Sequence, residues 1–138
     1  MDKKFIIDCL HEAMRDGRKS RLSQDVLNIA GFCPPKIRHF LNNLCMLPET
    51  RYLEIGTYKG ASLLSAAYKN VGQFTAIDNF SEFDGTRKAL QDNIAQFGRC
   101  YAWEGRIEFL EGDCWEIPPE KIPHDINIYY YDGNHSAE

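Results

Sequence analysis

Residues 51–62 constrain the fold more than any other part of this chain. They begin with a short apolar run that carries the acid Glu54, continue through Gly56 and Gly60, and end in residues that favour a helix. Glycine permits a tight turn and lets the backbone approach another group closely. The segment therefore predicts a strand, a turn and a helix, which together form the first unit of an α/β protein.

Strands and helices alternate along the chain after Pro48. Apolar periodicity and the Gly and Pro breaks predict strands at 52–55, 74–77, 107–110 and 126–131, and helices at 60–70 and 84–97. Three short helices are predicted before Pro48, at 3–15, at 23–31 and from Pro34 onward. We expect an N-terminal helical segment, residues 1–48, followed by an α/β domain with a parallel sheet, residues 49–138.

An acidic residue lies at or near the end of each predicted strand: Glu54, Asp78, Asp113 and Asp132. Ligands of parallel sheets bind beyond the carboxyl ends of the strands, so we expect these acids to meet at one site. Asp78 follows the second strand, where an acid can accept hydrogen bonds from both hydroxyls of a ribose.

The glycine turn differs from the dinucleotide-binding fingerprint G-x-G-x-x-G. The bulky Tyr58 stands where that fingerprint has its second glycine, and it would keep a pyrophosphate away from the backbone. Glu54 would repel phosphates from the same turn. These residues favour a ligand with a positive centre, a ribose and no phosphate, a description that fits S-adenosylmethionine. A NAD-dependent oxidoreductase domain of similar architecture is the alternative.

Four segments resemble the motifs of one enzyme family. Residues 53–62 resemble motif I of the class I S-adenosylmethionine-dependent methyltransferases, and are closest to the O-methyltransferase branch. Residues 76–80 and 110–114 resemble the second and third motifs. Residues 130–138 resemble the D-G-x-H-x-x-E segment of enzymes related to macrolide-sugar O-methyltransferases and cephalosporin-type hydroxylases. The resemblance covers residues 51–138 and implies a Rossmann-like, doubly wound parallel sheet with strand order 3-2-1-4.

The resemblance also implies an activity and a role for each motif residue. Methyl transfer from S-adenosylmethionine to a hydroxyl of a small molecule, such as a sugar, is expected. The implied cofactor-binding residues are Glu54, Gly56, Thr57, Gly60, Ser62, Asp78, Asn79, Asp113 and Cys114. Asp78 would hold the ribose, and Asp113 and Cys114 would flank the adenine. The implied catalytic residues are Asp132, as a ligand of a divalent metal such as Mg²⁺, and His135, as the general base.

Plainer interpretations of the same residues stay open. Asp132 with Gly133 could form an ordinary turn, and His135 could cap a helix or face solvent. Asp113 could be the N-cap of a helix. Cys114 has no basic neighbour in the sequence that would lower the pKa of its thiol, so it is expected to be a small buried side chain rather than a nucleophile.

Length and composition limit the function further. The 138 residues suit one domain, and a net charge of −4 without a basic cluster gives no sign of nucleic-acid binding. Five widely spaced cysteines argue against a disulfide framework, and no apolar run is long enough to span a membrane, so a cytoplasmic protein is expected.

The chain ends three residues after His135, where the family fold has three more strands. We therefore expect a truncated chain that binds the cofactor weakly and catalyses little. The fourth strand would then be an open edge of the sheet, so a non-catalytic fragment that forms homodimers through this edge is a further alternative.

Overall fold

Four parallel strands form the sheet of this protein, in the order β3-β2-β1-β4. The computed structural model describes residues 1–100 and 106–133. The strands are β1 (Arg51–Ile55), β2 (Gln73–Asp78), β3 (Arg106–Glu111) and β4 (Ile128–Tyr131). β1 pairs with β2 and β4, and β2 pairs with β3. The predicted α/β class and strand order are confirmed, and the fold is Rossmann-like with an N-terminal helical segment.

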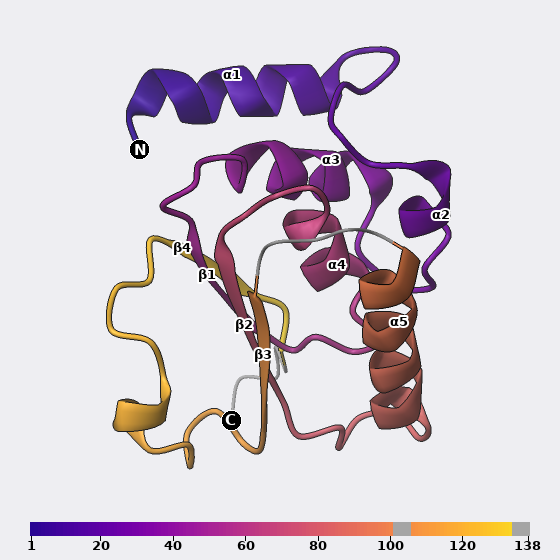
Figure 1. The fold of residues 1–138 in the computed structure, drawn as a ribbon, viewed down its shortest axis with the longest axis vertical. Helices are drawn as coiled ribbons and strands as arrows, with labels where there is room; N and C mark the ends of the chain where they lie inside the picture. Colours follow the sequence, from indigo (N-terminus) through magenta and orange to yellow (C-terminus); the bar gives the residue numbers. More distant parts are fainter. Residues whose placement is uncertain (101–105, 134–138) are drawn as a thin grey trace.

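The helices lie largely on one side of this sheet. The N-terminal segment contains α1 (Lys3–Met14), α2 (Gln24–Leu27) and α3 (Pro35–Leu44), whereas α4 (Ala61–Ala67) joins β1 to β2 and α5 (Thr86–Cys100) lies between β2 and β3. Figure 1 shows α3, α4 and α5 on one side of the sheet, and the connection through the 3-10 helix η1 (Pro119–Lys121) on the other. The carboxyl ends of all four strands thus point toward the same edge.

The ends of several helices follow from local chemistry. α1 begins after Asp2, whose carboxylate accepts the N–H of Phe5 at 2.8 Å. α3 begins at Pro35, a position where a missing N–H leaves no helical bond unmade. α4 begins after Gly60, which has a left-handed φ of +85°. All residues of α4 are buried because it is enclosed between the sheet and α3.

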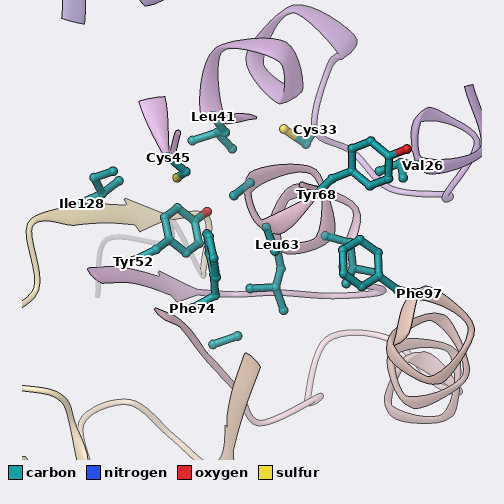
Figure 2. Packing of buried hydrophobic residues seen from close by; sticks show 14 of the residues in the cluster. Val26, Cys33, Leu41, Cys45, Tyr52, Leu63, Tyr68, Phe74, Phe97 and Ile128 are labelled. Atoms are coloured by element: carbon teal, nitrogen blue, oxygen red, sulfur yellow. The ribbon is translucent and has the colours of Figure 1, made fainter. Parts of the chain in front are cut away.

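One hydrophobic core joins the N-terminal helical segment to the sheet. Leu41 and Cys45 of α3 pack with Tyr52 and Phe74 of the central strands, and Leu63 of α4 belongs to the same cluster (Figure 2). The segment before residue 49 therefore contributes directly to the core that supports the sheet. The boundary between the two predicted parts stays a prediction.

Arg38 is a buried cation in this helical layer. Its guanidinium donates hydrogen bonds to the backbone carbonyls of Val26, Leu27 and Ile29, and to Ser65 Oγ of α4 at 2.8 Å. Burial lowers the pKa of Arg38. The side chain therefore links α3 to α4 and to the backbone that ends α2, with acceptors that are neutral.

Two findings concern the outer surface of the fold. None of the helices within residues 1–100 and 106–133 is both long enough and apolar enough to cross a membrane. β4 is an edge strand of the described sheet, and it carries the exposed side chain of Tyr129. Self-association through this edge stays a prediction.

Candidate functional site

A cleft of about 860 Å³ opens at the carboxyl ends of the strands. Its size is within the range of small-molecule and cofactor sites. Most of the predicted site residues line it: Gly56, Thr57, Ser62, Asp78, Asn79, Asp113, Cys114 and Asp132. Glu54 and Gly60 do not line it, and His135 lies outside the described residues.

Gly56 is required by a close approach within the fold. Its φ is +84°, and its N–H donates to the carbonyl of Ile77 at 2.9 Å. A Cβ at this position would lie 2.4 Å from the backbone oxygen of Asp132. The absent side chain therefore lets the turn after β1 pack against the end of β4, which brings Asp132 to the cleft.

Gly60 serves packing rather than the surface of the cleft. Its φ of +85° permits the turn into α4, and a Cβ here would lie 2.7 Å from a methyl group of Leu90 in α5. The glycine thus lets α5 approach the start of α4. Gly60 shapes the cleft through the position of α4.

Glu54 lies behind the cleft wall, where the sequence had suggested direct contact with the cofactor. It is 0% exposed, and its carboxylate accepts hydrogen bonds from the hydroxyls of Tyr52 (2.5 Å), Thr57 (2.7 Å) and Ser62 (2.7 Å). Thr57 and Ser62 do line the cleft. Because the strand alternates its side chains between two faces, Glu54 points into the same layer as Tyr52. Its action on a ligand therefore passes through these two hydroxyls.

Burial raises the pKa of Glu54 to about 7, although its three hydrogen bonds oppose the rise. In the unfolded chain the pKa is near the ordinary value of 4.5. The folded state therefore binds a proton more tightly, and the contribution of Glu54 to stability is fully present below pH 4.5. This contribution, about 3 kcal/mol, is lost as the pH rises to about 7.

Glu54→Gln is expected to flatten this pH dependence. Between pH 5 and pH 8, the wild-type free energy of unfolding should fall by about 2–3 kcal/mol more than that of the variant. Urea unfolding at both pH values measures the difference, and Glu49→Gln, at an exposed acid, is the control. Equal pH profiles for Glu54→Gln and the wild type would show that Glu54 does not titrate in this range.

Asp78 is held in place by the backbone around it. Its two carboxylate oxygens accept the N–H groups of Tyr58 (2.8 Å) and Phe80 (2.7 Å). Both donors have left-handed backbone conformations, with φ of +52° at Tyr58 and +55° at Phe80, which are unusual for bulky residues. Strained backbone of this kind concentrates at functional sites. Each oxygen retains a lone pair, so the carboxylate can accept further hydrogen bonds from a ligand in the cleft.

Asp113 begins a turn and not a helix. Its side chain accepts the N–H of Trp115 at 2.9 Å, and its carbonyl accepts the N–H groups of Glu116 and Ile117. Asp113 and Cys114 both line the cleft. Burial and the neighbouring Asp113 raise the pKa of the Cys114 thiol, which keeps it protonated and unsuited to attack as a nucleophile.

Asp132 reaches the cleft at the end of β4. Its N–H donates to the carbonyl of Ile55 at 2.8 Å, and its side chain is exposed. Within the described part of the chain, no three His, Cys, Asp or Glu side chains lie close enough together to hold a metal ion. The metal-binding role of Asp132 and the general-base role of His135 stay predictions.

Aromatic residues that the motifs did not reveal also line the cleft. Phe32, Tyr58 and Phe83 lie within 5.1–5.8 Å of one another, measured between ring centroids. Trp115 lines the cleft beside Asp113 and is 89% exposed. Its sequence position next to Asp113 could have indicated it, whereas nothing in the local pattern around Phe32 predicts that it reaches the site.

No protein-family model matches the chain, and no curated protein matches it. The functional interpretation therefore depends on the motif residues and on the geometry of the cleft.

Proposed function

We propose that this protein binds S-adenosylmethionine in the cleft and is a methyltransferase that acts on a hydroxyl of a small molecule. One observation carries the proposal: the turn after β1, Asp78 after β2 and Asp113 after β3 all line a single cleft. These are the places where the resembled family holds the methionine, ribose and adenine parts of the cofactor. The cleft is also large enough for a ligand of this size.

The hydrogen bonds of the turn favour a cationic group over a phosphate. A phosphate needs free donors, but the N–H groups of Gly56, Tyr58 and Gly60 are already bonded within the protein. The hydroxyl protons of Thr57 and Ser62 are given to Glu54. The two hydroxyl oxygens therefore face the cleft as acceptors, which suits the ammonium group of a methionine.

The ribose hydroxyls would be held by Asp78. Its carboxylate is oriented by two backbone N–H groups and needs no rearrangement to accept two further donors. This preorganisation places charge-assisted hydrogen bonds at the centre of the cleft. Asp113 and Cys114 would lie at the adenine end, with Trp115 beside them.

S-adenosylmethionine supplies a methyl group that its positive sulfur already activates. The residues of the chain therefore have mainly to hold and align the reacting groups. Asp132 would lie beside the acceptor hydroxyl, directly or through a metal such as Mg²⁺, and His135 would take the proton from that hydroxyl.

Asp78→Asn is expected to weaken the binding of S-adenosylhomocysteine by about 10- to 100-fold, because the amide accepts fewer hydrogen bonds and carries no charge. Titration calorimetry measures the affinity. Asp84→Asn is the matched control, since Asp84 is exposed in the loop after β2 and does not line the cleft.

The same titrations with NAD test the oxidoreductase alternative. Binding of S-adenosylhomocysteine but not NAD to the wild type supports the proposal. Binding of NAD alone, or an Asp78→Asn variant with unchanged affinity for S-adenosylhomocysteine, would contradict it.

A further inference from the structure

We propose that the methyl acceptor carries its hydroxyl on a flat aromatic ring system, and that this ring packs on Phe32 and Phe83. The inference rests on the proposed function, because it assigns the part of the cleft that the cofactor does not need. It replaces the sugar acceptor that the family resemblance suggests with a more apolar class of molecule.

Three chain segments build one aromatic wall, which we define as Phe32, Tyr58 and Phe83. Phe32 comes from the loop between α2 and α3, Tyr58 from the turn after β1, and Phe83 from the loop before α5. Ring centroids are 5.1 Å apart for Phe32 and Tyr58, 5.8 Å for Phe32 and Phe83, and 5.2 Å for Tyr58 and Phe83. These are the separations of packed aromatic pairs, so the wall is a continuous apolar surface.

The wall remains open to a ligand despite this mutual packing. Phe32 is 72% exposed and Phe83 is 50% exposed, and both line the cleft. Large apolar side chains gathered at one exposed place mark binding sites more often than chance exposure does. The loop that carries Phe32 is anchored close by, because Gly31 packs directly against Ala61 at the start of α4.

The wall adjoins the predicted cofactor residues without being one of their polar contacts. Tyr58 connects the two regions, since its N–H is bonded to Asp78 while its ring belongs to the wall. A molecule on the wall would thus lie next to a ribose held by Asp78. That neighbourhood is where an acceptor has to be for methyl transfer.

The chemistry of the wall favours an aromatic ring over a sugar. A sugar carries hydroxyls around its whole ring, and those turned toward phenylalanine would lose hydrogen bonds to water without replacement. An aromatic ring instead gains apolar contact and offset or edge-to-face packing. The nearby polar groups, Ser81 and Glu82, are few and lie on a single loop.

The test compares two probes on the full chain saturated with S-adenosylhomocysteine. The probes are 2-naphthol, a flat aromatic alcohol, and methyl α-D-glucopyranoside, and calorimetry measures their affinities. We expect 2-naphthol to bind and the glucoside not to bind. Phe32→Ala and Phe83→Ala should each weaken 2-naphthol binding at least about fivefold and change S-adenosylhomocysteine affinity less than twofold.

Val71→Ala is the control, because Val71 is an exposed apolar residue that does not line the cleft. Circular dichroism confirms that the variants are folded. Binding of the glucoside in preference to 2-naphthol would overturn the inference. So would an equal loss of S-adenosylhomocysteine affinity in Phe32→Ala, which would place the wall in the cofactor site.

The two proposals fail in different ways. A wild-type chain that does not bind S-adenosylhomocysteine contradicts the proposed function, and the acceptor assignment fails with it. A chain that binds S-adenosylhomocysteine but not 2-naphthol leaves the proposed function intact and overturns the acceptor assignment alone.

Discussion

Gly56→Ala is expected to lower the free energy of unfolding by about 4 kcal/mol, among the largest losses that a single methyl group can cause. An alanine must adopt the left-handed φ of +84°, which costs about 1–2 kcal/mol. Its Cβ would also lie 2.4 Å from the carbonyl oxygen of Asp132 and 2.6 Å from the nitrogen of Gly133. Both neighbours are backbone atoms, so relief requires the end of β4 to move away from β1.

Gly17→Ala separates the two causes of this loss. Gly17 has nearly the same φ, +85°, but a Cβ there would have no neighbour within 4 Å. It should therefore lose only the conformational part, about 1–2 kcal/mol. Urea unfolding of both variants gives the comparison. Similar losses for Gly17→Ala and Gly56→Ala would show that the contact with β4 contributes little.

Arg38→Met is expected to lower the free energy of unfolding by about 3–5 kcal/mol. Methionine can fill much of the space of the arginine stem but donates no hydrogen bond. The carbonyls of Val26, Leu27 and Ile29 would then lose their side-chain donor inside the helical layer. Because Arg38 also bonds Ser65 Oγ, the contact between α3 and α4 should loosen as well.

Lys36→Met on the same helix is the matched control, since Lys36 is exposed. It should change stability by less than about 0.5 kcal/mol. Thermal and urea unfolding give the two free energies. If Arg38→Met were as stable as the wild type, the free-energy cost of burying the guanidinium would offset its hydrogen bonds.

The strand and helix boundaries show how far local patterns reach. The fourth strand was expected at 126–131 but is Ile128–Tyr131, because the Asn127 side chain accepts the N–H of Arg51 at 2.8 Å where further strand pairing was expected. The helix expected at 84–97 extends to Cys100, since Gly98 lies in open space and does not end it. Glycine alone was therefore an unreliable sign of a helix end.

The candidate site was predicted better in its members than in their roles. The motif positions of Asp78 and Asp113 placed both residues at the cleft, because strand ends of a parallel sheet share an edge. Glu54 was expected beside the cofactor but lies behind Thr57 and Ser62. A carboxylate in an apolar strand looks the same in sequence whether it faces a ligand or three internal hydroxyls.

The sequence by itself determined the parallel α/β sheet, because apolar periodicity and turn residues are local signals that repeat along the chain. Only the tertiary structure decided that Gly56 packs against Asp132 and that Phe32 reaches Tyr58 and Phe83. These residues are brought together by the packing of segments far apart in the chain. The pattern around any one of them holds no record of its distant neighbours, so the wall of the cleft becomes visible only once the chain is folded.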